Sequence, residues 1–389
     1  MSKDMSNSQP LYQQIANHLI ERIEQNLLRP GDQIPTEQEI SDAFGVSRIT
    51  AVRAVKELET RGLVTRTKGR GSFVTSQSSW HSTGESQSER LSVVALVLPF
   101  QEMLALGVLL GVEQVVKANG LHTSLRNSTA DTRHEREILI QDSENGIGGM
   151  IVYPCSSADN IGAFSSLVVR RFPLVIIDRK IRGLDTPFVA VDNVDGTYQA
   201  TRHLVELGHR DIAFFGDAIS RIESEAERLR GYCRALIESR IPVRDELIIA
   251  DGLVVDERLD ADTGLDQFGY ISEATAGAAL EKLVGLSSPP TAIVCINDGN
   301  AVQFIKSALK RGIRVPEDLS VVGFDNLPFS AHIEVPLTTV EQPFRLIGER
   351  AAAMLMRRIA DPSAPYESEI LEPRLIVRES TGPPRSAGS

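Results

Sequence analysis

The sequence predicts an α/β protein in two parts: a small helical part with a β-hairpin, followed by a larger part built on a doubly wound parallel sheet. Two observations predict the sheet, because short apolar runs recur along the second part and segments of crossover-helix length separate them. A third observation divides the chain: residues 76–90 are rich in Ser and lack apolar periodicity, which is typical of flexible linkers. We therefore expect domains at 1–75 and 91–378, the linker 76–90 between them, and a disordered tail at 379–389.

Composition and charge exclude several classes of protein. The 389 residues are 42% apolar and 24% charged, which is typical of globular proteins. A net charge of −11 argues against binding polyanions through bulk charge, so any nucleic-acid site must be local. Residues 61–71 hold four cations and no acid. Three dispersed cysteines exclude a disulfide framework or a thiolate zinc cluster, and the lack of an export signal or a bilayer-length apolar run predicts a cytoplasmic protein with no membrane partner.

The amino-terminal part has the spacing of three helices. Apolar residues four apart predict the first helix, at Leu11, Ile15, Leu19, Ile23 and Leu27. Thr36 with Glu39 forms a capping box that opens the second helix, whose expected buried face is Ile40, Ala43 and Phe44. After the Gly45 turn, Ser47 caps the third helix, whose apolar stripe is Ala51, Val55 and Leu58.

Two short strands, residues 63–67 and 72–75, then flank the basic tip formed by residues 68–71 and predict a β-hairpin. Helix, glycine turn and helix form the helix-turn-helix arrangement, in which the second helix enters the major groove of DNA. Arginine forks suit guanine edges or phosphates, and a tip without Cβ atoms fits a narrow groove. The pattern therefore predicts a DNA-binding unit.

Residues 10–75 resemble the GntR family of winged-helix repressors. The resemblance lies in the stretches PLYQQIANHLIERI, LRPGDQIPTEQEIS, FGVSRITAVRAVKELETRGLV and TKGRGSFV. This chain departs from the usual SRxTVRxA pattern, because Ala51 precedes Val52. The resemblance implies a double-stranded DNA operator as partner, contacted from two helix starts and the hairpin tip by Thr36, Glu37, Arg48, Thr50, Arg53, Lys68, Gly69, Arg70 and Gly71.

The second part contains apolar runs that predict strands, namely VVALVLP, GMIVYP, PLVIID, DIAFFGD, ELIIADG, TAIVCIND and DLSVVGFD. Amphipathic segments between them predict helices at 107–119, 197–207, 228–239 and 300–311. Runs without alternating polar residues indicate strands buried on both faces. In such doubly wound sheets, ligands bind beyond the carboxyl ends of the strands.

From residue 93 to 378 the chain resembles the effector domain of the lactose-repressor family, which is similar to periplasmic sugar-binding proteins. The resemblance lies in PLVIIDR, VAVDNVDGTYQATRHLVELGHRDIAFFGD, RLRGYCRAL, TAIVCINDGNA, GIRVPEDLSVVGFDN and LTTVEQPFRLIG. A GntR DNA-binding domain, here called the reader (residues 1–75), joined to this effector domain is the arrangement of arabinose repressors. The resemblance implies two lobes that close on a small polar ligand.

The residues expected to contact this effector are Phe100, Asp178, Arg179, Arg228, Asn297, Asp325 and Gln342. Carboxylates, an arginine fork and amides can pair with the vicinal hydroxyls of a sugar, and Phe100 can stack on its C–H face. Caps and salt bridges between lobes are the structural alternatives for these charged residues. Val152 stands where the family often has a polar residue after GMI, which removes one possible ligand contact.

Enzyme motifs are missing from the sequence, which has no HExxH, GxSxG or GxxxxGK[ST]. We expect no catalytic residues, no metal site and no cofactor. The alternatives are a reader fused to a pyridoxal-phosphate enzyme, a sugar receptor, or the same regulator with a purine effector. The preferred interpretation is a homodimeric repressor of carbohydrate-utilisation genes whose operator binding a sugar controls.

Overall fold

The computed structural model divides the chain into two compact units, Met1–Arg90 and Leu91–Ser389, and each is described by itself. The structure describes residues 10–24, 27–29, 31–60, 63–67, 71–75, 93–99, 103–216, 219, 221–250 and 270–385. Within these ranges no helix is long and apolar enough to cross a membrane.

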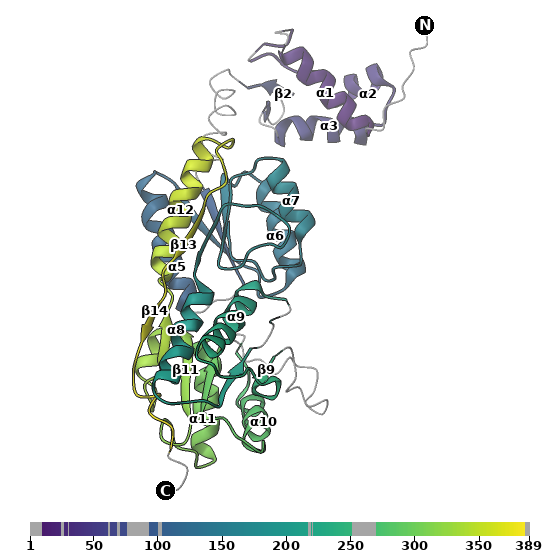
Figure 1. The fold of residues 1–389 in the computed structure, drawn as a ribbon. Coiled ribbons are helices and arrows are strands. Elements are labelled where there is room, and N and C mark those ends of the chain that lie inside the picture. Colours follow the sequence, from purple (N-terminus) through teal and green to yellow (C-terminus); the bar gives the residue numbers. More distant parts are fainter. Residues whose placement is uncertain are drawn as a thin grey trace. The chain divides into compact units, whose positions relative to one another are not determined.

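The first unit contains three helices and a hairpin (Figure 1). Its elements are α1 (Leu11–Glu24), α2 (Glu37–Phe44), α3 (Arg48–Thr60), β1 (Val64–Thr67) and β2 (Gly71–Val74). The two strands pair antiparallel, as predicted. The expected capping box opens α2, because the Thr36 side chain accepts a hydrogen bond from the Glu39 backbone while the Glu39 side chain accepts one from the Thr36 backbone.

The core of the first unit is formed mainly by the predicted apolar stripes. Its buried side chains include Ile15, Leu19, Ile23, Ile34, Ile40, Ala51, Ala54, Val55, Leu58, Val64 and Val74. Three expectations about this core are wrong. Ala43 lies on α2 but is exposed. Leu27 lies beyond the end of α1 and is exposed, and Phe44 is 41% exposed because it packs edge-on against the His18 ring instead of entering the core.

In the second unit, the first of two sheets defines lobe 1. Its strand order is β13 (Ser368–Leu371), β7 (Phe188–Val191), β6 (Leu174–Ile177), β5 (Gly149–Val152), β3 (Val93–Leu98) and β4 (His122–Asn127), all parallel. The helices α5 (Met103–Ala118) and α12 (Phe344–Ala360) pack on one face. The helices α6 (Thr132–Glu144) and α7 (Ile161–Val169) pack on the other, as a doubly wound sheet requires.

The second sheet defines lobe 2 and repeats this architecture. Its strand order is β14 (Arg374–Ile376), β12 (Thr338–Glu341), β11 (Ser320–Asp325), β10 (Ala292–Cys295), β8 (Ile212–Phe215) and β9 (Ile248–Ile249), with only β14 antiparallel among these described strands. The helices α8 (Asn193–Glu206) and α9 (Glu223–Glu238) cover one face, and α10 (Glu273–Val284) and α11 (Asp298–Lys310) cover the other. Single turns of 3₁₀ helix lie at Asp245–Leu247 and Pro328–Ala331.

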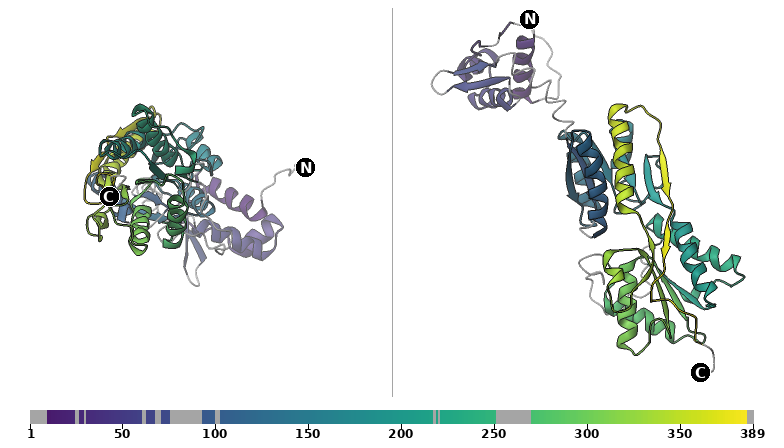
Figure 2. Two further views of the ribbon diagram at one scale, coloured as in Figure 1. Left: turned by 60° about the horizontal axis from the view of Figure 1, so that its bottom comes forward. Right: turned by 90° about the vertical axis from the view of Figure 1, so that its left-hand side faces the viewer.

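The chain passes between the two sheets after β7, after β12 and after β13. Helix α12 therefore returns from lobe 2 and packs beside α5 in lobe 1 (Figures 1 and 2). Two glycines allow the helix backbones to touch. A Cβ on Gly111 would lie 2.0 Å from the Arg345 carbonyl oxygen, and one on Gly348 would lie 2.2 Å from that of Val108.

Residues 379–385 pack on lobe 2, so the expectation of a disordered tail at 379–389 is wrong for this segment; residues 386–389 lie outside the described ranges. Ser380 is fully buried, and its hydroxyl donates to the Val321 carbonyl oxygen at 2.6 Å. The backbone N–H of Val321 in turn donates to the Ser380 carbonyl oxygen at 2.8 Å. The segment is ordered because it pairs with backbone groups of β11 through hydrogen bonds and not through an apolar stripe.

Candidate functional sites

The start of α3 is held by Ser47, as predicted. The Ser47 hydroxyl oxygen accepts a hydrogen bond from the Thr50 backbone N–H at 3.2 Å, and the two hydroxyl oxygens lie 2.8 Å apart. Ala51 is fully buried at the position where the sequence departs from the family pattern. The helix is therefore regular there, and its exposed face carries Arg48 and Arg53.

Arg53 also has a contact within the unit. Its guanidinium lies 4.3 Å from the centre of the Tyr12 ring on α1, which orients the side chain through a cation–π interaction. Arg48 is exposed at the first residue of α3, where a long cation can reach a base edge or a phosphate.

Thr36 and Glu37 at the start of α2 already have partners in the structure. The Thr36 hydroxyl is part of the capping box, and a Glu37 carboxylate oxygen accepts from the Arg66 guanidinium of β1 at 2.9 Å. Gly71 has φ +108°, and a Cβ there would lie 2.4 Å from Gln33 Nε2, so the hairpin itself requires this glycine. Lys68, Gly69 and Arg70 lie outside the described residues.

In the second unit, two of the predicted effector residues share an unusual backbone conformation at strand ends. Asp178 directly follows β6 in lobe 1 with φ +62°, and Asp325 ends β11 in lobe 2 with φ +122°. Residues other than glycine rarely adopt positive φ, and such strain concentrates at functional sites. Both acids are buried.

Asp178 lies between the lobes and is only partly paired. Its Oδ2 accepts a hydrogen bond from the Ser224 hydroxyl of α9 at 3.3 Å and lies 3.8 Å from Arg179 Nε. Its Oδ1 is buried without a hydrogen-bond partner among the described residues. The Arg179 Nε likewise has none there, although this guanidinium donates to the carbonyl oxygens of Pro154 and Cys155 at 3.1 and 3.0 Å.

In lobe 2, Arg228 is at the centre of a second buried cluster. Its Nε donates to Asn193 Oδ1 at 2.9 Å, a second nitrogen donates to the Ile296 carbonyl oxygen, and the guanidinium lies 3.8 Å from the centre of the Phe324 ring. Arg228 also lies 4.0 Å from Asp325. The guanidinium is therefore held rigidly, with its orientation set before any ligand binds.

Gln342 completes this cluster. Its Nε2 donates to Asp325 Oδ1 at 2.7 Å, while its own Oε1 is buried without a hydrogen-bond partner in the described part of the chain. Burial raises the pKa of Asp325 well above its ordinary range, although the nearby Arg228 cation lowers it. The cluster thus offers both donors and acceptors to a neutral polar ligand.

The remaining predicted residues differ in their placement. Asn297 is the N-cap of α11, where its side-chain oxygen accepts from the Asn300 N–H at 2.7 Å. Phe100 lies outside the described residues. The sequence interpretation missed Ser224 and Tyr153. Tyr153 directly follows β5 and is buried, and the Arg179 guanidinium lies 4.9 Å from the centre of its ring. Ser224 precedes Arg228 by four residues on α9, a spacing that places both on one helix face and could have identified it.

The lobes also contact each other beside this site. The Ser157 hydroxyl of lobe 1 accepts from the Glu223 N–H of lobe 2 at 3.1 Å. Ion pairs join Arg182 to Glu223 at 3.2 Å and Arg221 to Asp159 at 3.4 Å. These contacts join the two lobes beside the site.

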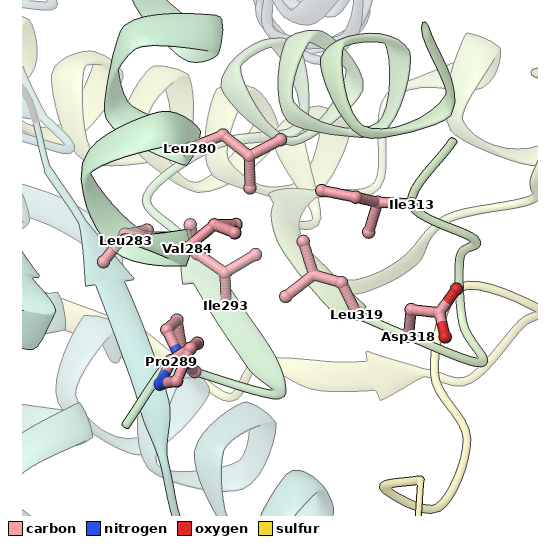
Figure 3. Close-up of a pocket in the computed structure, with 9 residues that line it drawn as sticks. Leu280, Leu283, Val284, Pro289, Ile293, Ile313, Asp318 and Leu319 are labelled. Carbon is pink, nitrogen blue, oxygen red and sulfur yellow. The ribbon is translucent and has the colours of Figure 1, made fainter. Parts of the chain in front are cut away.

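A pocket of about 200 Å³ lies at the amino ends of β10 and β11, and none of the predicted effector residues lines it. Figure 3 shows its apolar lining, with Leu280 and Ile293 beside Leu319. Its one charged lining residue, Asp318, is paired with Arg314 at 2.8 Å. The pocket therefore lacks the convergent polar groups that a sugar needs.

Three protein-family models match the chain. The model of bacterial regulatory proteins of the gntR family matches residues 11–74. The model of periplasmic binding proteins and the sugar-binding domain of the LacI family matches residues 100–252, and that of the periplasmic binding protein-like domain matches 201–381.

Among curated proteins, the arabinose metabolism transcriptional repressor of Geobacillus stearothermophilus is 30% identical over 383 residues, which cover 96% of this chain and 98% of that protein. Among solved structures, the transcriptional regulator CelR–cellobiose complex matches 89% of this chain and all of that one, with a TM-score of 0.64 and 23% identity. A LacI family transcriptional regulator from Enterococcus faecium with bound ribose matches 75% of this chain and 99% of its own, with a TM-score of 0.60 and 23% identity.

Proposed function

The chain belongs to the family of transcriptional regulators that join a GntR DNA-binding domain to a LacI-type, periplasmic-binding-protein-like domain, and we propose that a sugar bound between its lobes controls its binding to an operator. It is a DNA-binding regulator and not an enzyme. The proposed targets are carbohydrate-utilisation genes, which the protein represses.

The observation that carries the proposed effector site is that buried polar atoms following β6 and β12 lack hydrogen-bond partners among the described residues. Asp178 Oδ1, Arg179 Nε and Gln342 Oε1 are buried without hydrogen-bond partners among the described residues. Leaving such atoms unpaired costs about 1 to 3 kcal/mol each, a cost that ligand hydroxyls would remove. Two acceptors and a donor beside the Arg228 fork match the alternating hydroxyls of a sugar.

The proposed DNA contacts are those predicted from the sequence. Arg48 and Arg53 are exposed on α3 and can reach base edges or phosphates, while the Thr50 hydroxyl can reach a phosphate. Lys68, Gly69 and Arg70 belong to the proposed hairpin tip. For Thr36 and Glu37 the proposal requires their contacts within the unit to open or be shared with DNA.

We also propose a homodimer. Helix α5 exposes Leu106 and Leu110, which are 51% and 48% exposed, and the edge strand β4 exposes Leu125 at 49%. Helix α5 packs against β4, and exposed apolar side chains that lie together in one patch mark interaction sites. Two readers bound to two half-sites would multiply the specificity for the operator. Leu110→Asp should shift the sedimentation coefficient of the protein to that of a monomer.

Control by the effector requires that the ligand bind one conformation more tightly than another. Glu223 of lobe 2 contacts Ser157 and Arg182 of lobe 1, and a movement of the lobes apart would break these contacts. A ligand that pairs with Asp178 in lobe 1 and with Gln342 at the end of β12 therefore favours the closed form, and closure changes operator affinity.

The test is a thermal-shift screen of pentoses, hexoses, uronates and purines on the full chain. A ligand at 100 times its Kd should stabilise the native protein by about 2.7 kcal/mol. The relative named for arabinose metabolism makes pentoses the first candidates. Each ligand found is then added to the protein bound to its operator. If purines alone raise the melting temperature, the effector is a purine and the sugar proposal is wrong.

A further inference from the structure

We propose that Ile49 and Val52 of α3 read the C5-methyl group of thymine in the operator. This inference rests on the proposed operator binding and adds an apolar specificity contact to the charged contacts already predicted. Ile49 is the second residue of α3 and is 81% exposed, and Val52 is 39% exposed. Residues three apart are neighbours on a helix, so the two side chains form one apolar surface.

Among the described residues of the first unit, the core does not use these two side chains. The buried stripe of α3 is complete without them, because Ala51, Ala54, Val55 and Leu58 are 0–3% exposed and belong to the core. β-branched residues are also weaker helix formers than unbranched ones, so helix stability does not explain their presence. Both side chains keep apolar area in water that only a binding partner would remove.

The charges around this surface indicate which partner it fits. Arg48 precedes Ile49, Arg53 follows Val52, and Lys56 lies one turn further along the same exposed face. A cationic frame favours a polyanion over an apolar protein surface. Within the major groove, the thymine methyl is the apolar group that base pairs present, so a DNA partner places this group against Ile49 or Val52.

The test first selects operator duplexes from a random pool with the full-length protein. Deoxyuridine, which lacks only the C5-methyl group, then replaces each thymine of the selected duplex in turn. For the wild-type protein, one or two replacements should weaken binding about three- to fivefold, the effect of exposing one buried methyl group. Each of these penalties should fall below twofold in Ile49→Ala or in Val52→Ala, because one of the two variants has lost the apolar contact with that methyl group.

Leu27→Ala is the matched control, since Leu27 is an exposed apolar residue of the same unit outside α3. It should bind like the wild type and keep the full deoxyuridine penalty. Ile49→Val should keep part of the penalty, because it retains branched methyl groups. Because Ile49 is exposed, these variants should melt with the wild type.

Three results would overturn the inference while leaving operator binding intact: selected duplexes without a fixed thymine, no deoxyuridine penalty in the wild type, or an undiminished penalty in both alanine variants. A random pool that yields no preferred duplex would instead refute operator binding, and the methyl contact with it. The two failures are therefore distinguishable.

Discussion

Asp178→Asn tests the proposed effector site with little disturbance of the fold. Asparagine tolerates the positive φ of +62° at this position, and its side-chain oxygen can still accept from the Ser224 hydroxyl. The native state should therefore lose less than about 1 kcal/mol. The ligand, in contrast, loses a hydrogen bond to a charged acceptor at Oδ1, which is worth about 1.5 to 3 kcal/mol, or about 10- to 150-fold in Kd.

The assay is calorimetric titration of the sugar found in the thermal-shift screen, together with operator release at the same sugar concentrations. Asp142→Asn is the matched control, because it removes the same charge from lobe 1 at an ion pair with Arg126. This control should keep wild-type affinity for the sugar. Sugar binding by Asp178→Asn within twofold of the wild type would refute the assignment of the unpaired Oδ1 to the ligand.

Three further predictions concern the first unit and a buried acid. Gly71→Ala should lower the melting temperature of the first unit through a strained φ, worth about 1 to 3 kcal/mol, and Gln33→Ala added to it should relieve only the steric part; an unchanged melting temperature would contradict this. Arg53→Ala should weaken operator binding by about 1 to 3 kcal/mol if Arg53 contacts a base, and denaturant titration should show that the free energy of unfolding also falls by about 0.5 to 1 kcal/mol because the Tyr12 stacking is lost; an unchanged operator affinity and an unchanged ratio of operator to scrambled-duplex affinity would exclude a base contact. Burial raises the pKa of Asp298 to about 6, so the unfolded chain ionises first as the pH rises from about 4 to 6 and the free energy of unfolding falls in that window; Asp298→Asn should flatten this fall, and an identical pH profile would show that other groups cause it.

The central strands could be predicted because they are buried on both faces and therefore appear as continuous apolar runs. The edge strand β4 has no such run, since His122–Asn127 is largely polar and only half-buried, and the periodicity rule does not detect it. Residues 379–385 were wrongly expected to be disordered for a related reason. Ser380 is buried through hydrogen bonds to β11, and a composition rich in Ser, Gly and Pro gives no sign of such contacts.

The residues of the candidate site also fall into those that a sequence pattern predicts and those that it does not. Asp178 and Asp325 could be proposed because each follows an apolar strand, the place where a doubly wound sheet presents its ligands. The spacing of Ser224 and Arg228 places both on one face of α9, but it does not show that this face meets Asp178 of the other lobe, and Ser224 was therefore missed. Asn297 has a capping role that competes with ligand binding, and the sequence alone does not decide between these uses.

The late return of the chain to lobe 1 has a consequence for biosynthesis. The reader lies in the first part of the chain and has its own core, so it can fold as soon as it leaves the ribosome. Lobe 1, by contrast, is complete only after α12 and β13 have been synthesised, and lobe 2 is complete only after β14 has been synthesised. A premature stop before residue 344 would leave the apolar face of α5 uncovered. Chaperones and proteases would bind such a chain, so it would be degraded and would not act as a permanently active repressor.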